Sequence, residues 1–184
     1  MPSAFDTSAC RVALLSGGTS GEREISLASG EGALSALQEA GFPVECFDPS
    51  RKEDLKALID GNFDVAFLCL HGRKGEDGVI QGFLETIDLP YTGPGVWSSA
   101  TAINKARSKE FYRLAGVPTA PSMTLESDQK LDVDSIIGEI GPHVVVKPAS
   151  EGSSIGISIV DSREALEKAI DEAFQHDSEI VVEK

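Results

Sequence analysis

The sequence has few cysteines, few aromatic side chains and no long apolar run. Cys10, Cys46 and Cys69 are the only cysteines among 184 residues. Their odd number and wide spacing argue against a disulfide framework or a cysteine-rich metal site. No apolar stretch approaches the roughly 20 residues that a membrane-spanning helix needs. The N-terminus, MPSAFDTSAC, lacks the basic and apolar segments of a signal peptide. We therefore expect reduced thiols and a cytoplasmic protein that does not enter a membrane.

Positive charge is also scarce in this chain. Thirty acidic residues oppose 16 basic ones, which gives a formal net charge of -14. Such a chain repels polyanions on average, so we expect no nucleic-acid partner, and any phosphate must bind at a focused local site. A hydrophobic share of 41% and a charged share of 25% are typical of globular proteins. The length allows one generous domain or two small ones.

The chain contains no G-x-x-x-x-G-K-[ST] phosphate loop, but it has another combination of lysine and glycines. Residues 144–156 read VVVKPASEGSSIG, which predicts a short buried strand that ends at Lys147, followed by a flexible Gly/Ser loop. Residues 157–160 predict a returning strand. A lysine beside a loop rich in free N–H groups is suited to binding phosphate. The alternative is a β-hairpin with a glycine turn and a solvated lysine.

In the first half of the chain, strands alternate with helices. Strands are predicted at 11–16, 43–47 and 65–70, and the intervening patterns have helical spacing. This order predicts a parallel sheet with helices on its faces, and functional loops at the carboxyl ends of its strands. A dinucleotide site is the less favoured interpretation, because G-x-G-x-x-G is absent and Asp48 is a weak substitute for its spacing.

Two of these loops carry candidate polar residues. Glu22 begins a predicted helix, where it either complements the helix dipole or holds a substrate cation. His71 opens HGRKGEDG, which follows a strongly apolar strand, and it is either a hydrogen-bonded structural residue or a site residue.

A Pro/Gly cluster at 89–94 is the expected domain boundary, so we predict one domain over 1–94 and a second over 95–184. Helices are predicted at 96–103, 105–115 and 133–140 and again after 161–164, and strands at 122–125, 144–147, 157–160 and 179–183. The helix over 105–115 carries the only basic run of the chain: Lys105, Arg107, Lys109 and Arg113. This run is either a solvated helix face or a source of charge for a phosphate.

Five segments together carry a family resemblance. They are GGTSGEREIS at 17–26, LHGRKGEDGVIQG at 70–82, PYTG at 90–93, NKARSK at 104–109 and KPASEGSSIG at 147–156. In this order they resemble the D-alanine:D-alanine ligases of the ATP-grasp superfamily. The family normally has Asp where this chain has Asn104, and Lys105 itself is kept. The resemblance implies an α/β fold, with a parallel-sheet N-terminal domain followed by the first α+β subdomain of an ATP-grasp fold.

The resemblance also implies a reaction and a set of site residues. ATP would phosphorylate one D-alanine, and a second D-alanine would attack the acyl phosphate to give the dipeptide used in peptidoglycan. Glu22 and Ser153 are the implied catalytic residues, with His71 and Glu76 beside them in the substrate pocket. The implied ATP-binding residues are Lys105, Lys147, Glu151, Ser153, Ser154, Glu183 and Lys184.

Other expectations concern what the family places after this point of the chain. The ligands for Mg²⁺ are expected beyond Lys184 in a C-terminal ATP-grasp domain that this chain lacks, so we expect these 184 residues to be inactive alone. The family resemblance also leads us to expect a homodimer. Two other functions stay open: a non-catalytic nucleotide-binding fragment, and a ligase that joins D-alanine to D-lactate.

Overall fold

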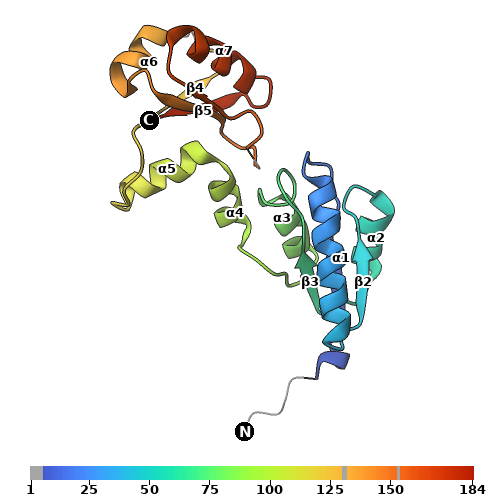
Figure 1. Cartoon of the computed structure of the whole chain (residues 1–184). Helices are drawn as coiled ribbons and strands as arrows, with labels where there is room; N and C mark the ends of the chain where they lie inside the picture. Colours follow the sequence, from blue (N-terminus) through green and yellow to red (C-terminus); the bar gives the residue numbers. More distant parts are fainter. Residues whose placement is uncertain (1–5, 130–131, 153) are drawn as a thin grey trace. The chain divides into compact units, whose positions relative to one another are not determined.

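The computed structural model of the chain describes residues 6–129, 132–152 and 154–184. It divides into two compact units, Met1–Ala100 and Thr101–Lys184, and each is described by itself (Figure 1). Whether these units correspond to the domains expected at 1–94 and 95–184 stays a prediction. None of the described helices is both long and apolar enough to cross a membrane.

The first unit is built around a parallel three-stranded sheet. Its strand order is β2-β1-β3, and Val12 of the central strand lies opposite Val44 and Val65. All four residues of the central strand are buried, which explains why its sequence is continuously apolar rather than alternating. The predicted parallel sheet is confirmed, and its strands are β1 (Val12–Leu15), β2 (Val44–Phe47) and β3 (Val65–Leu68).

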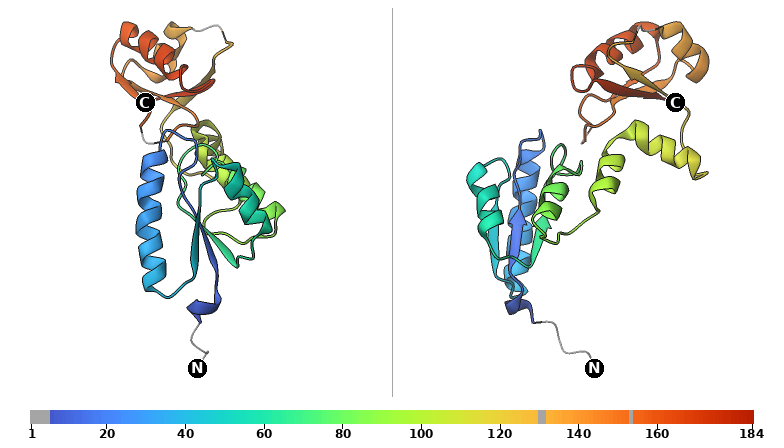
Figure 2. Two further views of the ribbon diagram at one scale, coloured as in Figure 1. Left: turned by 90° about the vertical axis from the view of Figure 1, so that its right-hand side faces the viewer. Right: turned by 180° about the vertical axis from the view of Figure 1, so that it is seen from behind.

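Helices cover both faces of this sheet. Ala13 and Leu15 of β1 share a buried cluster with Leu58 of α2 and Leu84 of α3, while α1 lies on the other face (Figure 2, left). The helices are α1 (Arg23–Glu39), α2 (Lys52–Asp60) and α3 (Val79–Thr86), and α4 (Val96–Ile103) follows them in sequence. Helices α1, α2 and α4 occur where the sequence predicts helices.

The second unit holds an antiparallel four-stranded sheet. The strand order is β4-β7-β5-β6, so that β7, the last strand in the sequence, lies between β4 and β5. Val182 pairs with Met123 on one side and Val146 on the other. The strands are β4 (Ser122–Glu126), β5 (Val144–Pro148), β6 (Ser158–Val160) and β7 (Glu179–Glu183).

The two faces of this sheet have different coverings. Ile180 and Val182 of β7 point into a large apolar cluster with α6 (Val133–Ile140) and α7 (Arg163–Ala173). Val181 points the other way, against Ala106 of α5 (Lys105–Leu114). Because side chains alternate along a strand, the charged residues that flank Val181 at odd positions face α5 as well.

Helices α4 and α6 and strand β7 have the predicted bounds, and most other elements with a predicted range differ from it by one residue at an end. Strand β3 ends at Leu68, two residues before the predicted end, although the backbone N–H of Cys69 still donates to Leu15 at 2.8 Å.

Two glycines of α1 give a matched test of its packing. A Cβ on Gly30 would lie 2.6 Å from the Cβ of Ser16, whereas a Cβ on Gly32 would meet nothing within 4 Å. We expect Gly30→Ala to lower the free energy of unfolding by roughly 1–3 kcal/mol, because α1 must move away from the sheet. Gly32→Ala should raise it by about 0.5–1 kcal/mol through helix propensity. Urea denaturation checks both variants, and equal effects would contradict the close approach.

Candidate functional site

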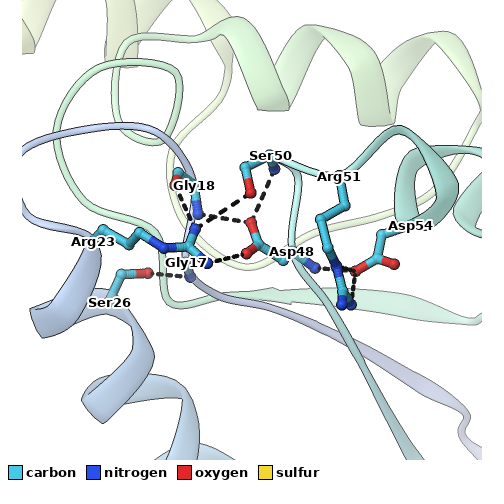
Figure 3. A network of polar contacts seen from close by, with 8 residues as sticks. All are labelled: Gly17, Gly18, Arg23, Ser26, Asp48, Ser50, Arg51 and Asp54. Carbon is cyan, nitrogen blue, oxygen red and sulfur yellow. Dashed lines mark hydrogen bonds and ion pairs between the residues drawn. The ribbon is translucent and has the colours of Figure 1, made fainter.

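The glycine loop after β1 is held by one partly buried ion pair (Figure 3). Arg23 Nη2 donates to Asp48 Oδ2 at 2.6 Å, and Arg23 Nη1 donates to the carbonyl oxygen of Gly18 at 2.6 Å. Asp48 Oδ1 accepts from the backbone N–H groups of Gly18 and Ser50. Burial by itself would raise the pKa of Asp48, but these hydrogen bonds, above all from Arg23, hold the pKa well below its ordinary value.

A second contact joins the same loop to α1 and to the end of β3. The fully buried Ser26 accepts from the N–H of Gly17 at 2.8 Å and donates to the carbonyl oxygen of Cys69 at 2.6 Å. Gly17 has φ +91°, and a Cβ there would lie 2.7 Å from Asp48. Only glycine fits this position, so the loop reaches Glu22 along a fixed path.

Three of the predicted site residues gather around Gly72. Glu22 is 9% exposed at the N-cap of α1, where its side chain makes no capping hydrogen bond. A Cβ on Gly72 would lie 2.8 Å from Glu22 Oε2, so this carboxylate lies against the Gly72 backbone. The N–H of Gly72 donates to Glu76 Oε2 at 2.7 Å, and His71 Nδ1 is 4.0 Å from Glu76 Oε1.

A cavity opens beside His71 within the first unit. Its volume is about 240 Å³, and its lining includes Gly18, Thr19, Ser50, His71 and Gly75. These residues follow β1, β2 and β3, so the carboxyl ends of all three strands contribute to it. Of the three residues around Gly72, His71 lines this cavity, whose charged lining residues are Lys52, Arg73 and Lys74. The Glu22 and Glu76 carboxylates lie beside Gly72 at the same edge of the sheet, where they suit a small ligand with a positively charged amine.

In the second unit, Lys105 lies at the start of α5 beside the segment that follows β5. Its Nζ donates to the carbonyl oxygens of Glu151 at 2.5 Å and Ala149 at 3.4 Å. Its backbone N–H donates to Ala149 at 2.8 Å. Burial and the positive charge of Lys147 lower the pKa of Lys105. Two ammonium groups that repel each other in a half-buried place form a site for an anion.

Glu183 joins two further lysines on the face of the sheet that α5 covers. Its Oε1 accepts from Lys147, and its Oε2 lies 2.8 Å from Lys109 Nζ. Burial would by itself raise the pKa of Glu183, but hydrogen bonds from Lys109 and Lys147 lower it overall. The basic run of α5 is therefore divided, since Lys109 is buried and Lys105 half-buried while Arg107 and Arg113 are exposed.

The Gly/Ser loop is anchored at its far end. Ser153 lies outside the described residues. Ser154 is exposed and has φ +63°, an uncommon conformation for a residue with a side chain. Gly156 packs so closely that a Cβ there would lie 2.7 Å from His176 Cδ2 and 2.8 Å from Pro148 Cγ. Lys184 is exposed, and its N–H donates to Pro121 at 3.0 Å.

Asn104, the residue that departs from the family pattern, has two contacts. Its Oδ1 accepts from the N–H of Arg107 at 2.9 Å, which caps α5. Its Nδ2 donates to Glu179 Oε2 at 2.6 Å. The amide thus uses both of its polar atoms, one toward the helix and one toward β7.

Sequence reasoning missed two parts of this site. From the sequence, Asp48 is only a weak substitute in a less favoured dinucleotide site, although its place directly after β2 puts it at the carboxyl edge where loops meet. Lys109 is left in a basic run that is either a solvated helix face or a source of charge for a phosphate, although Lys109 lies three residues after Ala106 on the buried face of α5. Among the described residues, no three His, Cys, Asp or Glu side chains gather so as to hold a metal ion.

Comparison with known proteins identifies the family. A family model described as the D-ala D-ala ligase N-terminus matches residues 48–94, and one described as the D-ala D-ala ligase C-terminus matches residues 111–184. A D-alanine–D-alanine ligase of Syntrophobacter fumaroxidans is 46% identical over 98% of this chain and 58% of its own length. One of Acinetobacter baumannii is 44% identical over 95% of this chain and 55% of its own length.

Solved structures agree with this assignment. D-alanine–D-alanine ligase from Bacillus anthracis matches with a TM-score of 0.87 and 34% identity, over 96% of this chain and 57% of that one. Its complex with ATP matches with a TM-score of 0.85 and 32% identity, over 96% and 58%. The fold is thus that of an ATP-grasp ligase, as the resemblance predicted. The chain belongs to the D-alanine–D-alanine ligase family, and it spans somewhat more than half the length of these relatives.

The Asp48 carboxylate gives a prediction on pH dependence. We expect Asp48→Asn to lower the free energy of unfolding by roughly 1–3 kcal/mol at pH 7, because a buried charge-assisted network is lost. A lowered folded-state pKa stabilises above the unfolded pKa, about 3.9, and this stabilisation is lost as pH falls through the folded value. Urea denaturation from pH 7 to pH 3 should therefore show the gap between wild type and variant constant at first and beginning to narrow below about pH 4.

The control is Glu45→Gln, which breaks the exposed ion pair with Arg11. It should change the free energy of unfolding by less than about 1 kcal/mol. A gap for Asp48→Asn that is independent of pH would contradict the assigned role of its charge.

Proposed function

We propose that the complete product of this gene joins two D-alanines with ATP, through a D-alanyl phosphate, for peptidoglycan synthesis. The observation that carries the proposal is the grouping of Glu22, His71 and Glu76 around Gly72. The family supports it, because the named relatives are D-alanine–D-alanine ligases. Since the chain covers 58% of the first of these, the test is made on the complete product.

On the substrate side, Glu22 is proposed to bind the ammonium group of the first D-alanine. Its carboxylate is largely removed from water, where an ion pair with a small cation is stronger than at the surface. His71 and Glu76 line the same edge and limit the room beside the methyl group. The hydrogen bond from Gly72 fixes Glu76, so this carboxylate is in place before the ligand binds.

On the nucleotide side, Lys105 and Lys147 are proposed to neutralise phosphate oxygens of ATP. Glu151 lies beside Lys105, and Ser153 and Ser154 belong to the loop that would add donors. Glu183 and Lys184 are proposed to meet the adenine edge. A relative's structure with ATP supports the choice of nucleotide. The role of these residues is positioning and charge stabilisation rather than covalent chemistry.

The proposed reaction has two steps. A carboxylate oxygen of the first D-alanine attacks the terminal phosphorus of ATP, and ADP leaves with the electrons of the broken P–O bond. The amine nitrogen of the second D-alanine then attacks the carbonyl carbon, phosphate leaves, and the nitrogen loses a proton. Mg²⁺, when bound, would neutralise charge on the phosphates of ATP. The described residues offer no group of His, Cys, Asp or Glu side chains that could hold it.

Several expectations from the sequence are carried forward as part of the proposal. The 184 residues alone should show no turnover, and D-alanine-dependent phosphate release by them would contradict this. The cytoplasmic location and the homodimer stay predictions, the latter open to light scattering. A D-alanine:D-lactate ligase would be distinguished by the mass of its product. A non-catalytic nucleotide-binding protein would bind ATP and form no product in the complete form.

A charge-neutral substitution tests the substrate role. Glu22→Gln in the complete protein should lower kcat/KM for D-alanine roughly 30-fold or more, because a desolvated ion pair to the ammonium is lost. ATP affinity should stay within about twofold, since no phosphate contact is removed. Phosphate release at varied D-alanine and isothermal calorimetry with ATP measure the two quantities.

The matched control is Glu31→Gln, an exposed glutamate on the same helix. It should leave both quantities near the wild-type values. Equal losses in the two variants would overturn the role of Glu22. If the complete wild-type protein makes no D-alanyl-D-alanine, the ligase proposal itself fails.

A further inference from the structure

Lys109 is a buried lysine to which the proposed reaction gives no role. It is 7% exposed, one of only a few buried charged residues among those described. Its ammonium group lies 2.8 Å from Glu183 Oε2 and donates to Thr119 Oγ1 at 2.8 Å. A lysine is rarely removed from water unless it is paired, so this position is maintained by Glu183.

Glu183 carries one negative charge and forms ion pairs with two lysines. Its two oxygens are divided between them, Oε1 to Lys147 and Oε2 to Lys109. Lys147 and Glu183 lie on neighbouring strands, with Val145 opposite Glu183 and Lys147 opposite Val181. Both side chains therefore face α5, which supplies Lys109. The group of three has a net positive charge, which an anion can balance.

The two lysines differ in their surroundings. Lys109 is held by the hydroxyl of Thr119 as well as by Glu183, and its side chain is 8% exposed. The Lys147 side chain is 18% exposed, and its charge lies close enough to Lys105 to lower the pKa of that lysine. A bound anion would relieve the repulsion between Lys105 and Lys147, but it would bring no benefit to Lys109.

We propose that Lys109 is the permanent counter-ion of Glu183, which leaves Lys147 available to bind a phosphate of the nucleotide. When an anion arrives, Lys147 exchanges Glu183 for a phosphate oxygen. Glu183 keeps its charge compensated by Lys109 and stays in place. Lys109 is thus a positioning residue that acts through Glu183. This inference rests on the proposed function, because it takes the phosphate to be that of ATP.

The exchange predicts how affinity changes when Lys109 is replaced. In Lys109→Met, Glu183 has Lys147 as its remaining lysine, so ATP must compete with a buried ion pair for Lys147. ATP affinity should fall roughly tenfold or more, whereas adenosine, which has no phosphate, should bind within about twofold of wild type. Isothermal calorimetry on the complete protein, with ATP and with adenosine, measures both affinities.

Rescue separates the positioning role from a structural one. Adding Glu183→Gln to Lys109→Met removes the charge that retains Lys147, so the ratio of ATP affinity to adenosine affinity should recover by several-fold relative to Lys109→Met alone. Adenosine affinity reports any loss at the adenine edge that Glu183 is proposed to meet. A residue that only stabilised the fold would give no recovery. Lys109→Arg keeps the positive charge and should retain most of the affinity for ATP. Lys168→Met, which removes an exposed lysine on α7, is the control for lost net charge.

The possible outcomes distinguish this inference from the proposed function. If wild type binds ATP and Lys109→Met binds it equally well, the counter-ion role is overturned and the proposed function stands. If Lys109→Met weakens ATP and adenosine by the same factor, or if the ratio of ATP affinity to adenosine affinity is lower still in the double variant, Lys109 is structural and the inference fails. If the wild-type protein binds ATP no more tightly than adenosine, the proposed phosphate role of Lys147 is wrong, and this inference fails with it.

Discussion

The two faces of strand β7 pack against different layers, α6 and α7 on one side and α5 on the other, and the arrangement of the second unit depends on this. The three middle residues of β7 are fully buried, yet they alternate between a large apolar cluster and a small one under α5. Glu179 and Glu183 flank Val181 on the α5 side, where Glu179 accepts from the N-cap residue Asn104 and Glu183 pairs with Lys109 of the helix. Small apolar contacts in the middle and charged contacts at both ends hold α5 in a single register. The proposed nucleotide lysines occupy this same face.

In the first unit, the parallel direction of the three strands determines where the functional loops lie. Parallel strands end at one edge, so the loops that follow β1, β2 and β3 meet there without any sequence proximity. Ser26 and Asp48 then join these loops through buried hydrogen bonds to the glycine turn. A net charge of -14 does not oppose anion binding in the second unit, because the acidic groups beside its lysines are themselves neutralised within hydrogen-bond distance.

The sequence predicted the elements well, because strand and helix periods are local properties. Helices α4 and α6 needed no correction, and the glycine stops and apolar stripes that define them lie within a few residues. The partners in the ion pairs could not be predicted from local patterns. Arg23 and Asp48 are 25 residues apart, and Lys147 and Glu183 are 36 apart. Which charge meets which depends on strand order and side-chain face, and the order β4-β7-β5-β6 is not contained in any local pattern.

The hydrogen bond between Asn104 and Glu179 has an evolutionary consequence. The amide can donate to the carboxylate at 2.6 Å, whereas an aspartate at this position could still cap α5 but would oppose Glu179 with a second negative charge. The two positions are therefore not free to vary independently. With aspartate at 104, the positive partner of both carboxylates would be Arg107, whose Nη2 lies 3.7 Å from Glu179 Oε1, and the seating of α5 on β7 would depend on that guanidinium.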